Sequence, residues 1–243
     1  MMTLLDVLAL HADPVPLKQL AQETGLHPST AHRILGAMSS CGFVERVDAG
    51  VYRLGIRLLQ LGNLVKTRIS VRESAVEWME QLHQTTGESV NLGMRDGDVI
   101  VYVERTSSGR SAVRVVHIVG GRGPLHTTAT GKLFLADMSP SEVKDYALRT
   151  SLPAATPASI TSLASLEAEL AKVRQSGLAY DIEELEIGVR CIAAAIRDDT
   201  GKLIAGLSLS TPTERFNPDL AELVRKTADA ISHTLGYQEG LSA

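Results

Sequence analysis

The segment from residue 17 to residue 38, LKQLAQETGLHPSTAHRILGAM, carries the strongest structural signal in this sequence. Apolar residues recur at helical spacing on both sides of Gly25, which stands where the chain has to turn and tolerates a positive φ. Pro28 suits the first turn of a second helix, because an amide hydrogen there would have no intrahelical partner. The pattern predicts a helix-turn-helix, a motif whose second helix binds in the major groove of DNA.

The predicted second helix has two different faces. Its apolar residues follow the i, i+3, i+4, i+7 rule and are expected to point inward, namely Ala31, Ile34, Leu35 and Met38. Hydrogen-bonding residues remain on the outer side near the helix N-terminus, the end that contacts base edges: Ser29, Thr30, His32 and Arg33. The alternative is an ordinary helical hairpin whose polar face is only solvated.

A predicted β-hairpin follows this segment. Residues 43–46 and 51–54 are strand-like and are bridged by a turn that contains Asp48 and Gly50, which is typical of the wing of a winged-helix domain. Arginines on this hairpin are expected beside the DNA backbone, where they add sequence-independent, salt-sensitive affinity. The complete predicted DNA-binding set is Lys18, Ser29, Thr30, His32, Arg33, Arg46 and Arg53.

The length of 243 residues allows two compact domains. Residues 55–66 are apolar at helical spacing and predict a linker helix, so we place the domains at residues 1–66 and 67–243. The chain shows no run long enough for a transmembrane helix and no secretory signal, and its two cysteines are far apart, so we expect a cytoplasmic protein without disulfides, not bound to a membrane. The net charge of −4 gives only a weak basic footprint, so tight DNA binding would require dimerisation.

The second predicted domain mixes strands and helices. A hairpin is predicted across the RDGD turn, between residues 89–94 and 98–104. Further strands are predicted at residues 113–118, 180–184, 191–197 and 203–210, and helices at 71–86, 130–138, 140–148, 163–175 and 217–236, with Pro218 in the first turn of the last one. Because hairpins imply antiparallel pairing, this region is expected to be an α+β domain with a mainly antiparallel sheet.

The chain resembles the isocitrate lyase regulator (IclR) family of bacterial transcription factors. Besides the helix-turn-helix, the resemblance rests on GPLHTTATGK (123–132), DIEELEIGVRCIAAAI (181–196) and GLSLSTPTER (206–215). It implies a winged helix-turn-helix, a linker helix and a C-terminal effector domain like those of GAF and PAS sensors. It also implies a homodimer or a dimer of dimers that binds double-stranded operator DNA and responds to a small carboxylate.

The resemblance also implies an effector pocket, carried over position by position to Ala129, Thr130, Asp181, Cys191, Ser208 and Ser210, with Val115 and Val189 as apolar lining. Amides where Thr130–Lys132 opens a helix can cradle a carboxylate, and serines two apart on a strand face the same side. Gly123 stands where family members often carry a larger apolar residue, which predicts a roomier pocket on that side.

The same residues also suggest other chemistry. The ATGK segment fails as a phosphate-binding loop, because His126 stands where a glycine is required and Leu133 follows Lys132. Cys191 with His117 or His126 resembles a nucleophile with its base, and with Asp181 these residues could gather around a metal. We predict no enzyme, catalytic residue, cofactor or metal ligand, and keep a metal- or redox-sensing regulator and a DNA-tethered enzyme as alternatives.

Overall fold

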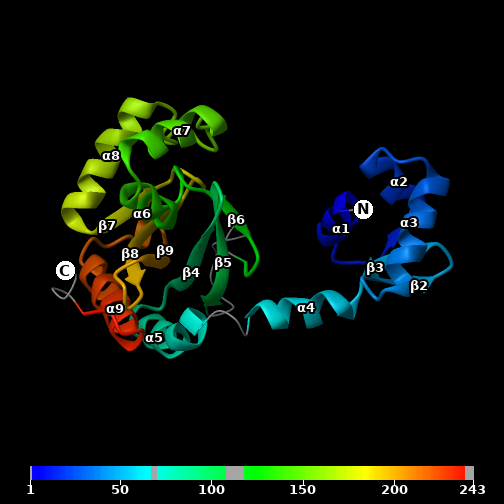
Figure 1. The fold of residues 1–243 in the computed structure, drawn as a ribbon, viewed down its shortest axis with the longest axis horizontal. Coiled ribbons are helices and arrows are strands. Elements are labelled where there is room, and N and C mark those ends of the chain that lie inside the picture. Colours follow the sequence, from blue (N-terminus) through cyan, green and yellow to red (C-terminus); the bar gives the residue numbers. More distant parts are fainter. Residues whose placement is uncertain (1, 67–69, 108–117, 239–243) are drawn as a thin grey trace. The chain divides into compact units, whose positions relative to one another are not determined.

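The computed structural model describes residues 2–66, 70–107 and 118–238. The chain is divided into two compact units, Met1–Ile69 and Ser70–Ala243 (Figure 1). No helix in these described segments combines the length and the apolar character needed to cross a membrane.

The first unit is a small helical domain with a three-stranded antiparallel sheet. The sheet has the order β1-β3-β2. Its elements, in chain order, are α1 (Met2–Ala9), β1 (Val15–Pro16), α2 (Leu17–Thr24), α3 (Pro28–Ser40), β2 (Val44–Asp48), β3 (Val51–Leu54) and α4 (Ile56–Lys66). The helix-turn-helix, the wing and the linker helix all lie where the sequence predicts them. The short strand β1, which pairs with β3, was not predicted.

The turn between α2 and α3 has the predicted backbone geometry. Gly25 has a φ of 68°, and the amide of Leu26 donates to the carbonyl of Ala21 at 3.0 Å. His27 then caps α3, because its ring accepts a hydrogen bond from the backbone amide of Ser29. Glycine therefore closes the first helix, and His27 with Pro28 opens the second.

The second unit is built on a six-stranded antiparallel sheet with the order β6-β5-β4-β9-β8-β7. Its strands are β4 (Ser89–Asp96), β5 (Val99–Thr106), β6 (Arg122–Pro124), β7 (Leu178–Ile182), β8 (Val189–Arg197) and β9 (Leu203–Pro212). Its helices are α5 (Ser70–Thr86), α6 (Ala129–Asp137), α7 (Pro140–Thr150), α8 (Leu163–Ser176), α9 (Leu220–Thr234) and the short 3₁₀ helix η1 (Thr213–Arg215). The α+β class and the antiparallel sheet are as predicted.

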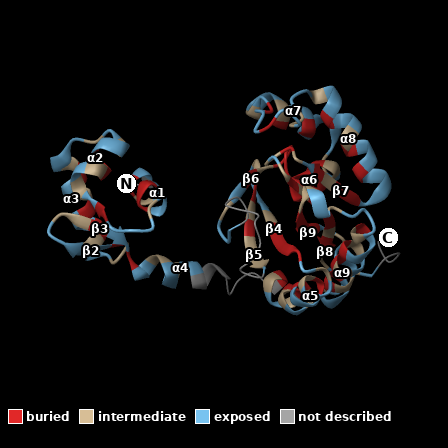
Figure 2. Ribbon diagram, turned by 180° about the vertical axis from the view of Figure 1, so that it is seen from behind, coloured by how far each residue is buried: buried red, intermediate tan, exposed pale blue. Residues whose placement is uncertain are grey.

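Helices cover both faces of this sheet. α5 and α9 lie together on one face, and α6 with α8 lies on the other (Figure 1). Figure 2 shows that the strands between them are largely buried. Sequence alternation therefore separates the strand residues into two buried layers, one facing α5 and α9 and one facing α6.

Two predicted boundaries in this unit were wrong. The strand predicted over 180–184 runs instead over 178–182, because Glu183 adopts a φ of 63° and ends it. The C-terminal helix begins at Leu220, so Pro218 lies in the preceding turn. Of the strand predicted over 113–118, residues 113–117 lie outside the described residues, and Ile118 lies in a bend.

Candidate DNA-binding surface and effector site

The exposed side of α3 carries the residues predicted to read DNA. Ser29, His32 and Arg33 are exposed and Thr30 is half-buried, as the helical spacing predicts. The opposite side of the helix is packed into the core of the first unit through Ala31, Leu35 and Met38, with Ile34 partly buried. The contact of the outer side with bases stays a prediction.

The wing arginines already have partners within the hairpin. Arg53 forms a two-pronged ion pair with Glu45 on the neighbouring strand, with N–O distances of 2.9 and 3.0 Å. Arg46 donates to the carbonyl of Asp48 at 3.2 Å. Lys18 is exposed on α2. Phosphate binding by Arg53 therefore has to compete with Glu45.

In the second unit, the predicted effector residues meet on the face of the sheet that packs against α6. Asp181 pairs with Cys191, and Cys191 pairs with Ser210, so these side chains form one row across β7, β8 and β9. Ser208 lies two residues from Ser210 on the same face. All four side chains are buried, as is Val189, whereas Val115 lies outside the described residues.

The first turn of α6 packs against this row of side chains. Ala129 and Thr130 are buried, and Ala129 belongs to the same hydrophobic cluster as Cys191. The methyl group of Thr130 fills the space over Gly206, where a Cβ would come within 2.7 Å of it. A glycine on β9 thus allows the helix to approach the strand that carries Ser208.

The predicted amide cradle at Thr130–Lys132 is only partly available. The amide of Gly131 donates to the side chain of Thr128 at 3.1 Å, and the amide of Lys132 donates to the carbonyl of Thr128 at 3.0 Å. Thr128 is the N-cap of α6, which explains why these groups are satisfied within the protein. A ligand would have to compete with these internal acceptors, so the cradle stays a prediction.

The prediction of a roomier pocket beside Gly123 was wrong. A Cβ at Gly123 would lie 2.7 Å from the methyl group of Thr128. The space that a larger side chain would use is therefore already filled by the helix cap.

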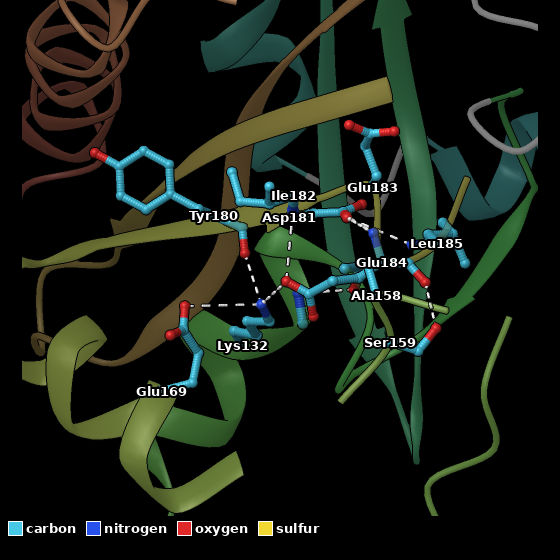
Figure 3. Close-up of polar contacts among 12 residues, drawn as sticks. Lys132, Ala158, Ser159, Glu169, Tyr180, Asp181, Ile182, Glu183, Glu184 and Leu185 are labelled. Atoms are coloured by element: carbon cyan, nitrogen blue, oxygen red, sulfur yellow. Dashed lines mark hydrogen bonds and ion pairs between the residues drawn. The ribbon is translucent and has the colours of Figure 1, made fainter. Parts of the chain in front are cut away.

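Lys132 on α6 is fully buried, and three oxygen atoms lie around its ammonium group (Figure 3). Its Nζ donates to Oε1 of Glu184 at 2.5 Å and to the carbonyl of Tyr180 at 2.7 Å. Glu169 on α8 lies 3.8 Å away. This cluster fixes the loop that follows β7 to the first turn of α6.

Asp181 holds the same loop from the other side. Its Oδ1 accepts from the amide of Glu184 at 2.7 Å and from the amide of Leu185 at 3.4 Å (Figure 3). Burial raises the pKa of this carboxyl from 3.8 to about 7, against the opposing effect of these two amides. The carboxyl therefore binds a proton more readily than an exposed aspartate.

Comparison with known proteins agrees with this arrangement. Residues 1–48 match the IclR helix-turn-helix domain, and residues 64–233 match the family described as bacterial transcriptional regulator IclR C-terminal. The chain belongs to the IclR family. It is 33% identical to the HTH-type transcriptional regulator XynR of Escherichia coli, over 96% of this chain and 94% of that protein. It is 35% identical to KdgR of Dickeya chrysanthemi, over 93% and 75% of the two chains.

Solved structures of IclR-family proteins have the same fold. The IclR protein of Thermotoga maritima matches with a TM-score of 0.80 and 31% identity, over 97% of each chain. An IclR homolog from Microbacterium hydrocarbonoxydans, described as complexed with 4-hydroxybenzoate, matches with a TM-score of 0.82 and 27% identity, over 96% of this chain and 98% of that one. The curated relatives are transcriptional regulators, so the family assignment argues against the DNA-tethered enzyme.

The surroundings of Cys191 in this IclR-family protein also argue against a nucleophilic role for its thiol. Its sulfur lies 3.2 Å from Oγ of Ser210, and burial raises the pKa of the thiol. Both ring nitrogens of His126 have other partners, the hydroxyl of Tyr146 at 2.7 Å and the carbonyl of Pro153 at 3.1 Å. Within the described residues, no three His, Cys, Asp or Glu side chains are grouped for a metal, and His117 lies outside them.

Several residues of this region were missed by sequence reasoning. Asn91 donates from Nδ2 to Oγ of Ser210 at 3.0 Å, and Arg105 donates from Nη2 to Oγ of Ser89 at 3.3 Å. The available signal was the alternation in β4, where Ser89 and Asn91 interrupt a run of apolar residues at a period of two. Polar residues at that period in a strand buried on both faces point into one layer of the interior.

Proposed function

We propose that this IclR-family regulator binds operator DNA through α3 and the wing, and that a small carboxylate bound in the second unit changes that affinity. The observation that carries the DNA-binding part is the division of α3 into a buried apolar side and an exposed side with Ser29, His32 and Arg33. That division leaves the reading side free for a major groove.

Two copies of the chain are required in this proposal. One first unit offers few cations, and Arg53 is already paired with Glu45. A homodimer, or a dimer of dimers, doubles the contacts by placing two α3 helices in successive major grooves of a near-palindromic site. The proposed place of action is the bacterial cytoplasm, where such a site is accessible.

The effector part rests on the buried polar row on the α6 face of the sheet. Asp181, Cys191, Ser208 and Ser210 offer hydrogen-bonding groups among apolar neighbours, which is the composition that small-ligand sites have. Ala129 and Thr130 lie above them, and Val115 and Val189 are proposed as apolar lining. The 4-hydroxybenzoate described for the Microbacterium homolog is consistent with a small organic acid as the occupant.

The DNA-binding part is tested by substitutions on the outer side of α3. Duplexes enriched from a random pool by the wild-type protein serve as the probe, and fluorescence anisotropy measures affinity. Arg33→Ala and Thr30→Ala are each expected to weaken binding about fivefold to a hundredfold. Lys226→Ala, which removes an exposed cation from α9, is the matched control and should bind as the wild type does. Unchanged affinity in both α3 variants would contradict this interface.

The effector part is tested by a thermal-shift screen of the wild-type protein against mono- and dicarboxylates, aromatic acids and sugar acids. An acid that stabilises the wild type should lose this effect when Ser208→Ala and Ser210→Ala are combined, whereas Ser141→Ala, on the surface of α7, should retain it. A full effect in the double variant would remove these serines from the site. Metal analysis of the purified protein tests the metal-sensing alternative.

A further inference from the structure

One histidine accepts the hydrogen bonds of the first turn of α3. The carbonyl of His27 accepts from the amide of Thr30 at 2.9 Å and from the amide of Ala31 at 3.0 Å. Nδ1 of its side chain accepts from the amide of Ser29 at 3.4 Å, and Pro28 has no amide hydrogen. Since the first amides of a helix lack acceptors within the helix, this side chain acts as the N-cap. His27 is exposed at the end of α3 that is expected to read DNA.

The same ring nitrogen also contacts the hydroxyl of Ser29. Nδ1 of His27 and Oγ of Ser29 lie 2.8 Å apart. An amide can only donate, so the cap requires a lone pair on Nδ1 and places the hydrogen of the neutral ring on Nε2. The hydroxyl of Ser29 is therefore the donor in its contact with Nδ1, and its hydrogen points to the ring.

This arrangement limits what the exposed side of Ser29 can offer to a base. A free serine hydroxyl rotates, so it can donate to one base and accept from another. In the major groove, guanine and thymine present acceptor oxygens, whereas adenine and cytosine present amino groups that donate. A hydroxyl whose hydrogen is held by a ring nitrogen can only accept, so it suits an amino group.

We propose that His27 is a positioning residue that determines base preference: it holds the hydroxyl hydrogen of Ser29, so that Ser29 accepts a hydrogen bond from the amino group of adenine or cytosine. The inference rests on the proposed function and deepens it, because it assigns the chemistry of one base contact of α3. Guanine or thymine at the same position would place an acceptor oxygen against the oxygen of Ser29. The preference therefore comes from repulsion as well as from a lost hydrogen bond.

The test measures base preference in addition to affinity. Duplexes enriched from a random pool by the full-length wild type and by Ser29→Ala identify the base position at which Ser29 acts. Fluorescence anisotropy then compares duplexes that carry each of the four bases at that position. We expect the wild type to bind the duplex with adenine or the one with cytosine about fivefold or more tightly than those with guanine and thymine.

Substitutions of His27 separate its effect on base preference from its role as a cap. His27→Gly leaves a residue that an N-cap tolerates but that has no side-chain acceptor, so it should reduce the preference to about twofold or less. His27→Asn keeps a side-chain acceptor at the cap and should keep part of the preference. In the Ser29→Ala background, His27→Gly should change the preference no further, because the group that it positions is gone.

Two further measurements control this comparison. His233→Ala, which removes an exposed imidazole from α9, is the matched control and should keep the preference of the wild type. Circular dichroism melting shows whether each variant is folded. Nitrogen NMR of the histidine rings at mildly alkaline pH identifies His27 by the resonances that are missing in His27→Asn, and should place its ring hydrogen on Nε2 in the free wild type. This spectrum decides the question if His27→Gly is not folded.

A full preference in folded His27→Gly, or a ring hydrogen on Nδ1 of His27, would overturn the role of His27 and leave the DNA-binding surface standing. A preference for guanine or thymine at the Ser29 position would show that the hydroxyl donates, and would overturn it as well. Equal preferences of the wild type and Ser29→Ala at every position would remove Ser29 from base reading. If the wild type enriches no duplex, the proposed DNA-binding function fails, and this inference fails with it.

Discussion

Lys132 and Glu184 form a buried ion pair although 52 residues separate them in the sequence. The pair joins the first turn of α6 to the loop after β7, and these are the two segments that flank the proposed effector site (Figure 3). Because both partners are buried, removing one leaves the other charged in a medium that solvates it poorly. The site is therefore supported by a contact that fixes its walls relative to each other.

We expect Lys132→Met to lower the free energy of unfolding by about 3–5 kcal/mol, the range found when one partner of a buried pair is lost. Urea denaturation followed by the fluorescence of Trp78, the single tryptophan and a residue of the second unit, measures this value. Combining Lys132→Met with Glu184→Leu should recover part of the loss. The control is Lys226→Met, which removes an exposed ion pair with Glu222 on α9 and should cost less than about 1 kcal/mol. Equal losses in the two single variants would contradict the prediction.

We expect the wing to bind DNA backbone more strongly once Arg53 is released from Glu45. Glu45→Gln should tighten binding to a non-specific duplex and make the dependence of log K on log salt steeper by up to about one. Anisotropy titrations at several KCl concentrations measure this slope. Adding Arg53→Gln to the same protein should abolish the gain, and Glu167→Gln, on the surface of α8, should not produce it. An identical gain with and without Arg53 would show that the effect is only one of net charge.

Asp181 should make the folded protein less stable as the pH rises. Burial raises the pKa of its carboxyl from 3.8 to about 7, so between these values the folded state holds a proton that the unfolded chain releases. Its contribution is therefore most favourable below about pH 4 and is lost as the pH rises to about 7, by at most about 4 kcal/mol. In urea denaturation at about pH 5 and about pH 8, Asp181→Asn should lose less stability between the two conditions than the wild type. Asp145→Asn, on the surface of α7, should follow the wild type, and a parallel course for Asp181→Asn would contradict the assignment.

The two thiols should differ strongly in reactivity. Cys41 is exposed, whereas Cys191 is only 3% exposed and burial raises the pKa of its thiol. Titration of the folded protein with Ellman's reagent at neutral pH should therefore modify one thiol rapidly and the second only after denaturant is added. The folded Cys41→Ser variant should show no rapid phase. Rapid modification of Cys191 in that variant would indicate that its site opens readily.

The local elements of the first unit could be predicted from the amino-acid sequence. The faces of α3, the turn at Gly25 and the wing hairpin all follow from spacing and from the backbone preferences of single residues, which act within a few positions of each other. The alternating strands of the second unit followed for the same reason. The grouping of Asp181, Cys191 and Ser210 on three different strands, in contrast, was implied only by the family resemblance.

The partners of the buried polar groups could be assigned only from the way that the helices and strands pack. Thr128 uses the amides of Gly131 and Lys132, Glu184 compensates the charge of Lys132, and Arg105 on β5 donates to Ser89 on β4. None of these relationships has a fixed spacing in the chain. Each depends on how strands and helices far apart in sequence pack, because a buried donor or charge takes the partner that the fold places within reach.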